Sequence, residues 1–250
     1  FFESEFIPFC RLKSAKDHVF FQSIYTNGVK TNRDAWVYSF SKESLEKRMI
    51  QTIQYYNEQV LSLNLAKKKE TELKAEKFLD FKATDKISWS GDLISQADKG
   101  NEYKFQYENI RKAMYRPFIK ENLYFSRVFN NSIYQIPKIF PFQSVKNLVI
   151  CVSGVGVTKD FSCIITDTLP DLELIGKSQC FPLYYYEERS KESRGLFDDE
   201  ESGSDYIRRD GVSDFIWERC KKQYGKNVSK EDIFYYVYGF LHSPDYRTTF

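Results

Sequence analysis

The chain has 250 residues, of which 42% are hydrophobic and 17% aromatic, enough to build one large or two small domains with a buried core. Its formal net charge of +2 does not by itself indicate a nucleic-acid partner, and no apolar run is long enough to cross a membrane. Five cysteines without a CxxC pair and only two histidines argue against a zinc site. We therefore expect free thiols and a cytoplasmic location.

The first 40 residues are predicted to be rich in β-structure. Residues 18–25 form a strand candidate because of their β-branched and aromatic side chains, and residues 26–28 predict a turn after it. In the polar loop that follows, Lys30 and Arg33 are candidates for contacts with phosphates or bases, and a solvated hairpin end is the alternative. A further alternative is an ion pair in which Asp34 orients Arg33.

A long helix is predicted over residues 42–63. Ser41 is a good N-cap, and Glu43 complements the positive end of the helix dipole. Apolar side chains then recur at steps of three and four residues, which places them on one face. These side chains are Leu45, Met49, Ile53, Tyr56, Val60 and Leu63. We expect this helix to support or space a binding surface, and the lysine-rich segment after it to be solvated.

Two short segments separate this helix from the basic part of the chain. Residues 87–93 are predicted to end in a turn, and residues 105–114 to form a strand and then a short helix. Pro117 disfavours helical geometry at the residue before it, so Arg116 is expected in an extended, stiff segment. A stiff arginine suits bidentate contacts with guanine or a phosphate, and it equally suits a buried ion pair with a carboxylate.

Residues 103–142 combine many cations with many aromatic rings. They include seven basic and two acidic residues, so the local charge is 7 − 2 = +5, and residues 123–159 contain no acid. This local excess on a nearly neutral chain indicates a polyanion partner, because cations placed near phosphates release counterions. The rings either stack on bases or belong to the core, and for any single ring the core is the commoner place. These rings are Tyr115, Phe118, Tyr124, Phe125, Phe129, Tyr134, Phe140 and Phe142.

The next part of the chain alternates predicted strands and loops. A polar turn at residues 130–132 is predicted to join two aromatic strands, and residues 145–152 to form a buried strand. The glycine pair after that strand lacks the third glycine of a nucleotide-binding loop, so a hairpin is predicted there. Residues 181–186 predict another aromatic strand. The charged segment 187–205 predicts a flexible acidic surface loop.

Two helices are predicted at the end of the chain, over residues 214–224 and 230–242. Ser213 is the expected cap of the first and Gly225 its stop, while the second begins with a sequence close to a capping box, SKED, at residues 229–232. Together with the strands, these helices predict an α+β fold in which β-rich reading elements are supported by helices.

The chain also carries a series of short aromatic and charged blocks. They are RDAWVY (33–38), KISWS (86–90), YRPF (115–118), LYF (123–125), YQIP (134–137), ITDTLPD (165–171), QCFPLY (179–184), DIFYYVYG (232–239) and LHSP (241–244). In this order they resemble the C-terminal target-recognition domain of type ISP restriction–modification enzymes, which are single-polypeptide type I systems. Each block alone is unspecific, and it is their number and order that carry the resemblance. Gly91 and Asp92 follow KISWS where a basic residue would favour binding.

The resemblance implies that residues 1–250 are a target-recognition domain within a longer polypeptide. The absent domains would carry adenine-N6 DNA methylation with S-adenosylmethionine, and translocation and cleavage of DNA with ATP and Mg²⁺. The sequence motifs of these activities do not occur in this chain, so we expect it to hold no catalytic residue, metal site or cofactor of its own. The expected partners are double-stranded DNA and the methyltransferase domain of the same polypeptide, without a membrane.

Ten basic or amide side chains are candidate DNA contacts. They are Lys30, Arg33, Lys104, Arg116, Lys120, Arg127, Asn130, Gln135, Lys138 and Lys159. Cations would hold the register on the phosphates, and a few polar groups would read base edges in the major groove. The alternatives are a non-catalytic module that binds RNA or a protein, a catalytic fragment, and a scaffold whose basic face meets an acidic neighbouring domain.

Overall fold

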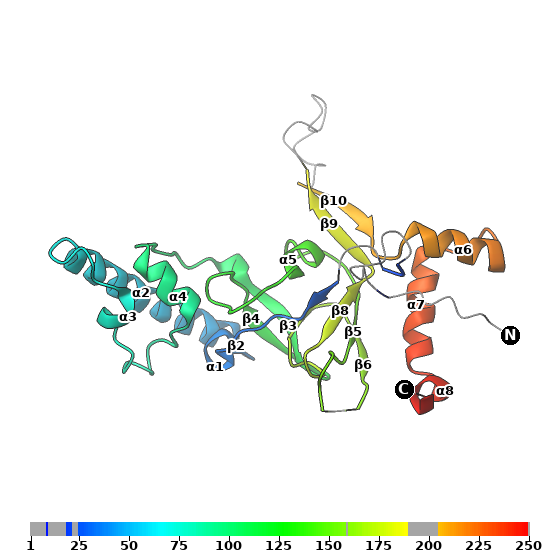
Figure 1. The fold of residues 1–250 in the computed structure, drawn as a ribbon, viewed down its shortest axis with the longest axis horizontal. Coiled ribbons are helices and arrows are strands. Elements are labelled where there is room, and N and C mark those ends of the chain that lie inside the picture. Colours follow the sequence, from blue (N-terminus) through cyan, green and yellow to red (C-terminus); the bar gives the residue numbers. More distant parts are fainter. Residues whose placement is uncertain (1–8, 10–18, 22–24, 159, 190–204, 250) are drawn as a thin grey trace, which may run out of the picture. The chain divides into compact units, whose positions relative to one another are not determined.

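The structure, a computed structural model, describes residues 9, 19–21, 25–158, 160–189 and 205–249. The chain divides into two compact units, which we call the terminal unit (Phe1–Gly28 with Tyr134–Phe250) and the insert unit (Val29–Ile133). The insert unit therefore interrupts the terminal unit along the sequence. Both units contain helices and strands, which confirms the predicted α+β class (Figure 1).

The insert unit combines one long helix with short helices and a small antiparallel sheet. Its elements are α1 (Asp34–Val37), β2 (Tyr38–Ser39), α2 (Lys42–Lys67), α3 (Ala75–Phe78), α4 (Gly91–Asp98), the 3-10 turn η1 (Tyr107–Asn109), β3 (Ile110–Arg116) and β4 (Ile119–Tyr124). The strands pair in the order β2–β4–β3. Near the two ends of the unit, Lys30 and Ser132 exchange both backbone hydrogen bonds, with N···O distances of 2.8 and 2.9 Å.

Helix α2 confirms the helix predicted after residue 41 and extends four residues beyond the predicted end at residue 63. The Ser41 hydroxyl accepts a hydrogen bond from the Ser44 amide at 3.1 Å and so satisfies a free donor of the first turn. All six apolar side chains predicted for one face are buried. Burial of that face, rather than helix propensity alone, stabilises a helix of this length.

The β3–β4 hairpin forms the centre of the small sheet. Its register places Ile110 opposite Tyr124, and it shifts just before Arg116, at a bulge. The turn that joins the strands contains Phe118 with φ of 64°, in the left-handed region that non-glycine residues seldom adopt. The Phe118 side chain is 88% exposed, so the hairpin tip presents an aromatic ring to solvent.

The terminal unit contains a four-stranded antiparallel sheet, a separate hairpin and a group of helices. Its elements are β1 (Thr26–Asn27), α5 (Ile136–Ile139), β5 (Val149–Val152), β6 (Cys163–Thr166), β7 (Leu169–Pro170), β8 (Gln179–Pro182), β9 (Tyr184–Glu188), β10 (Tyr206–Asp210), α6 (Asp214–Tyr224), α7 (Lys230–Leu241) and α8 (Pro244–Thr249). The sheet has the order β1–β8–β5–β6, and β9 pairs with β10. The hairpin predicted around the glycine pair is confirmed by the β5–β6 pairing.

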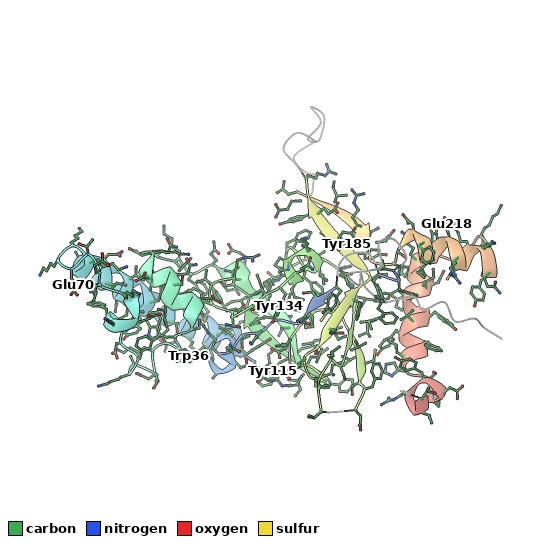
Figure 2. The ribbon with its side chains drawn as sticks, viewed as in Figure 1. Trp36, Glu70, Tyr115, Tyr134, Tyr185 and Glu218 are labelled. Atoms are coloured by element: carbon green, nitrogen blue, oxygen red, sulfur yellow. The ribbon has the colours of Figure 1, made fainter. Side chains whose placement is uncertain are left out.

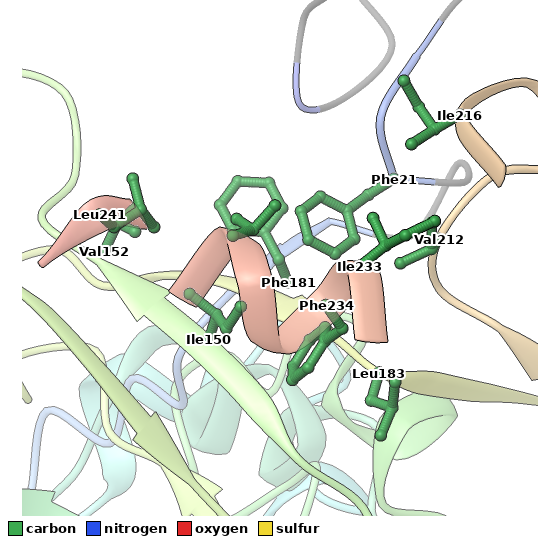
Figure 3. Packing of buried hydrophobic residues seen from close by; sticks show 11 residues of the cluster. Phe21, Ile150, Val152, Phe181, Leu183, Val212, Ile216, Ile233, Phe234 and Leu241 are labelled. Atoms are coloured by element: carbon green, nitrogen blue, oxygen red, sulfur yellow. The ribbon is translucent and has the colours of Figure 1, made fainter. Parts of the chain in front are cut away.

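The core of the terminal unit lies between its sheet and the inner face of α7 (Figure 3). The Phe21 ring lies 5.1 Å from that of Phe181 and 6.4 Å from that of Phe234, measured between centroids. Helix α7 begins with a capping box, in which the Ser229 hydroxyl accepts from the Asp232 amide and the Asp232 carboxylate accepts from the Ser229 amide. Both predicted C-terminal helices are therefore confirmed.

Three predictions about local structure were wrong in the terminal unit. Thr26–Asn27 is a strand paired with β8, not a turn. Gly28 serves close approach instead, because a Cβ there would meet the Asp171 carbonyl oxygen at 2.4 Å. The expected aromatic strand after residue 132 is the short helix α5, which has a proline in its first turn. The single strand predicted over 181–186 is divided between β8 and β9.

Two predictions failed in the insert unit. The segment expected to end in a turn near residue 91 instead starts helix α4, whose N-cap Ser90 accepts from the Leu93 amide. The order expected over residues 105–114 is reversed, since the turn η1 comes before strand β3. Half of the predicted strand at 18–25 and residues 190–204 of the predicted acidic loop lie outside the described residues.

Neighbouring leucines on α2 provide a test of the insert-unit core. Leu63 is fully buried and Leu61 is 55% exposed. Leu63→Ala is expected to lower the free energy of unfolding by about 2–5 kcal/mol, because it removes packed methyl groups and leaves a cavity. The matched control Leu61→Ala is expected to change it by less than about 0.5 kcal/mol. Urea titrations followed by circular dichroism measure both, and equal losses would contradict the assigned core face.

Candidate nucleic-acid interface

A polar cluster lies where α1 meets the β3–β4 hairpin of the insert unit. Asp34 is the first residue of α1, and its carboxylate accepts hydrogen bonds from the Thr31 hydroxyl and, at 3.1 Å, from the Tyr115 hydroxyl. The Arg116 Nη2 atom lies 3.5 Å from Asp34 Oδ2. Figure 2 labels Tyr115 within this part of the chain. One carboxylate therefore connects the loop before α1 to the end of β3.

Arg116 is held by more than its ion pair. Its Nη1 atom donates to the Tyr115 carbonyl at 2.6 Å, and its guanidinium carbon lies 3.8 Å from the centroid of the Tyr115 ring. It is the last residue of β3, as expected for the residue before a proline. The Arg116 side chain is still 32% exposed. The ion pair that the sequence left as one alternative is therefore present, but it is not fully buried.

A second carboxylate faces the same cluster. Glu121 lies in β4, opposite Ala113 of β3, and is only 8% exposed. Burial raises the pKa of Glu121, Asp34 raises it further, and the Arg116 guanidinium opposes both by favouring the charged form. The charges of Arg116 and Asp34 therefore act on Glu121 in opposite directions.

Arg33 occupies a different position from the one expected. It is 7% exposed, and its Nη2 atom donates to the Ser90 hydroxyl oxygen, which also caps α4. Burial lowers the pKa of Arg33 to about 10, and the charge of Asp92 opposes that shift. The alternative ion pair between Arg33 and Asp34 is wrong, because the Asp34 carboxylate instead contacts Thr31, Tyr115 and Arg116. Arg33 therefore links the loop before α1 to the start of α4.

The ten candidate contacts fall into groups by exposure. Four are exposed: Lys104, Lys120, Arg127 and Lys138. Three are partly exposed: Lys30, Arg116 and Gln135. Two are buried: Arg33 and Asn130. Lys159 lies outside the described residues. Gln135 and Lys138 belong to the terminal unit and the other described candidates to the insert unit, so the structure does not bring all ten together in one unit.

The two amide candidates bond to the backbone. Asn130 is fully buried, and its Oδ1 atom accepts from the Ser126 amide at 2.9 Å, which closes the loop after β4. The Nε2 atom of Gln135 donates to the Tyr25 carbonyl at 3.1 Å. Both side chains stabilise loops in this structure, and base reading by either one stays a prediction.

The aromatic rings of the basic stretch divide between the two roles left open by the sequence. Tyr124, Phe125, Phe129 and Phe140 are buried in the cores. Phe118, Tyr134 and Phe142 are exposed, with exposed fractions of 88%, 41% and 38%. Tyr115 is intermediate in exposure. Its hydroxyl donates a hydrogen bond to Asp34, and its ring contacts the Arg116 guanidinium.

Sequence reasoning missed several members of the cluster. Thr31 and Tyr115 were not among the ten candidate contacts, and Asp34 was considered only as a partner of Arg33. Lys112, an exposed cation in the middle of β3, was also omitted. The alternation of β3 could have identified Lys112, whose neighbours Arg111 and Ala113 are buried. No local signal could have identified the bond between Asp34 and Tyr115, which are 81 positions apart.

Neither a metal cluster nor a membrane-spanning helix is found among the residues that the structure describes. No group of three or more His, Cys, Asp or Glu side chains there could hold a metal ion. Over the same residues, no helix has the length and apolarity needed to cross a membrane. The four cysteines within these ranges are free thiols, as expected.

Comparison with known proteins gives one consistent family. A family model described as the type ISP C-terminal specificity domain matches residues 20–250. No curated protein matched the chain in the sequence search. Solved structures similar to the chain include a DrdV–DNA complex studied by cryo-EM, with a TM-score of 0.77 and 31% identity. Another is a nuclease-deletion mutant of the type ISP restriction-modification enzyme LlaGI in complex with a DNA substrate mimic, with a TM-score of 0.77 and 30% identity.

A third similar structure is the ATP-dependent type ISP restriction-modification enzyme LlaBIII bound to DNA, with a TM-score of 0.74 and 31% identity. These matches cover 98%, 98% and 97% of this chain. They cover only 22%, 20% and 14% of the DrdV, LlaGI and LlaBIII chains, respectively. The chain therefore spans about a fifth or less of the length of these solved relatives.

Replacement of Asp34 tests whether its carboxylate organises the cluster. Asp34→Asn is expected to lower the free energy of unfolding by about 1 kcal/mol, because neutral hydrogen bonds remain possible and a partly exposed ion pair contributes little. The control Glu70→Gln changes an exposed carboxylate after α2 and is expected to have no measurable effect. Urea titration of both variants measures this difference. Equal stability of the Asp34 variant and the parent would contradict an organising role.

Proposed function

Because the chain belongs to the family of type ISP C-terminal specificity domains, we propose that it recognises the target sequence in double-stranded DNA for a restriction–modification enzyme. The match over residues 20–250 and the DNA complexes of the similar structures support this proposal. The observation that carries it within the molecule is Arg116, a partly exposed arginine that is oriented by a carboxylate, a carbonyl and an aromatic ring.

The β3–β4 hairpin is the proposed reading element. A two-stranded ribbon fits the major groove of B-form DNA, where base edges offer distinct patterns of donors and acceptors. The exposed cations Lys112 and Lys120 lie on the two strands, and Phe118 lies at the tip. In this arrangement the lysines contact phosphates and fix the register, while Arg116 reads a guanine edge. The bracing of Arg116 reduces the conformational entropy that it loses on binding.

The remaining candidates have supporting roles in this proposal. Lys30, Lys104 and Arg127 would add phosphate contacts from the insert unit, and Lys138 from the terminal unit. Arg33, which is buried, would act by holding the loop that carries Thr31 and Asp34. These assignments follow from exposure and charge, and each is tested by the same binding measurements.

The chemistry of the enzyme is proposed for the rest of the polypeptide. A methyltransferase domain of the same chain would use S-adenosylmethionine to modify an adenine at N6, after flipping that base from the duplex. ATP and Mg²⁺ would serve its translocation and cleavage activities. The short span of this chain relative to LlaGI and LlaBIII supports such a division of labour. The buried free thiols support a cytoplasmic location.

Selection of duplexes from a randomised pool tests the proposed function. The chain is expected to enrich one short sequence motif, at low salt and at near-physiological salt, because base contacts depend less on counterion release than phosphate contacts do. Binding without enrichment would contradict base reading. Absence of duplex binding, together with binding of RNA or of a protein, would favour the alternative of a non-DNA scaffold module.

The proposed reading role of Arg116 is tested by its variants. Arg116→Ala is expected to cost about 1–3 kcal/mol of discrimination at one base pair and to relax the enriched motif there. Arg116→Lys keeps the charge but removes the bidentate geometry, so it is expected to lose discrimination while retaining most of the non-specific affinity. A uniform loss for all sequences with both variants would show a phosphate contact instead.

The proposed phosphate role of Lys120 is tested by the salt dependence of binding. Lys120→Ala is expected to weaken binding to all sequences equally and to lower the slope of log K against log salt by about 0.9. Lys68→Ala provides a control, because Lys68 is an exposed lysine at the end of α2, away from the hairpin. A loss of sequence preference in Lys120→Ala would contradict this assignment.

A further inference from the structure

The terminal unit has a large apolar groove lined mainly by residues of α6, α7 and α8, together with Phe9 and Phe20. The groove has a volume of about 670 Å³, and its lining includes Cys220, Tyr224, Val228, Tyr236, Phe240 and Tyr246. Among the described residues that line it, Asp232 is the only charged one. None of the candidate DNA contacts that the structure describes lines the groove.

Helix α7 is apolar on more than its inner face. Ile233, Phe234 and Leu241 belong to the core shown in Figure 3. On the outer side, Tyr236 is 70% exposed and Phe240 is 49% exposed. A surface helix normally has polar side chains opposite its core face. Neither Tyr236 nor Phe240 belongs to the described core of the terminal unit, so that core does not account for the aromatic outer side of α7.

Neighbouring elements extend this exposed aromatic surface. Tyr224 at the end of α6 is 74% exposed and faces the same groove. The Tyr236 and Phe240 rings stack with centroids 6.4 Å apart, and the Phe240 ring lies 5.4 Å from that of Tyr246 on α8. Contiguous exposed apolar surface marks interaction sites, and Tyr and Phe are enriched in the centres of interfaces. The Tyr236, Phe240 and Tyr246 rings are therefore contiguous, and Tyr224 lines the same groove.

We propose that this groove docks an amphipathic helix from another domain of the same polypeptide. The chain covers 22%, 20% and 14% of its similar structures, so most of such a polypeptide lies outside the region that matches. A domain of the same chain is present at high effective concentration and forms the permanent, apolar kind of interface that the lining requires. The docked helix presents aliphatic side chains at positions i, i+3 or i+4, and i+7.

The charges at one end of the groove set the direction of the docked helix. Asp232 and Glu231 lie in the first turn of α7, and both are exposed. Hydrogen bonds from Ser229 hold the pKa of Asp232 below its usual range, so its carboxylate is charged at neutral pH. A lysine or arginine of the docked helix therefore pairs at this end, while its apolar side chains contact Tyr236 and Phe240.

Cys220 provides a probe of the groove that does not depend on DNA. It lines the groove and is partly exposed, whereas Cys151 and Cys180 are fully buried. We would label the full-length polypeptide and the 250-residue chain with a maleimide, in the absence of DNA, and read each cysteine separately by mass spectrometry. Cys220 is expected to react about tenfold or more slowly in the full-length polypeptide, because docking leaves it reactive only when the interface opens.

The result that overturns the proposal is an equal rate of Cys220 labelling in the two proteins. Protection that appears in the 250-residue chain alone and grows with its concentration would overturn it too, because a second copy would then fill the groove. Cys151 and Cys180 report on folding, since their labelling would reveal an unfolded sample. If the full-length polypeptide protects Cys220 but does not recognise a DNA sequence, the proposed function is contradicted and the docking site is not.

Variants of α7 identify the docking face within the full-length polypeptide. The double variant Tyr236→Ser with Phe240→Ser is expected to raise Cys220 labelling to the rate of the 250-residue chain. Tyr235→Ser is the matched control, because Tyr235 is 45% exposed on the same helix but does not line the groove. This control is expected to retain protection. Retained protection in the double variant would overturn the assignment of these two rings.

Discussion

The carboxylate of Asp34 is the group on which the candidate interface depends. It accepts hydrogen bonds from Thr31 and Tyr115 and lies 3.5 Å from the guanidinium of Arg116. These contacts join the loop before α1 to the strand that ends at the hairpin turn. A hydrogen bond to a carboxylate is stronger than one between neutral groups, so a short helix such as α1 acquires a fixed position. Without it, Arg116 would retain its ring contact but lose this ion pair.

The sequence predicted elements that depend on residues close together in the chain better than elements that depend on residues far apart. Helix α2 and the capping box of α7 follow from residues within a few positions of one another, and both were predicted. The strand at Thr26–Asn27 exists because it pairs with β8, more than 150 positions later, so its local turn signal was misleading. The same limit applies to the interface: the basic stretch was visible in the sequence, but its bracing carboxylate was not.

Arg33 shows how charge in a sequence can be misread as surface charge. A loop with Lys30, Arg33 and polar neighbours suggested contacts with a polyanion, yet Arg33 lies buried against the cap of α4. Burial of an arginine is costly, and its hydrogen bond to Ser90 and the charge of Asp92 offset only part of this cost. The buried position fits a role in fixing the geometry of the insert unit.

The paired hydrogen bonds between Lys30 and Ser132 hold the two ends of the insert unit side by side. A segment whose ends meet in this way can be removed or replaced with little change to the chain around it. The insert unit also carries its own core around α2 and the whole β3–β4 hairpin. Recombination at its two boundaries could therefore exchange the insert unit, with the proposed reading hairpin, as one segment.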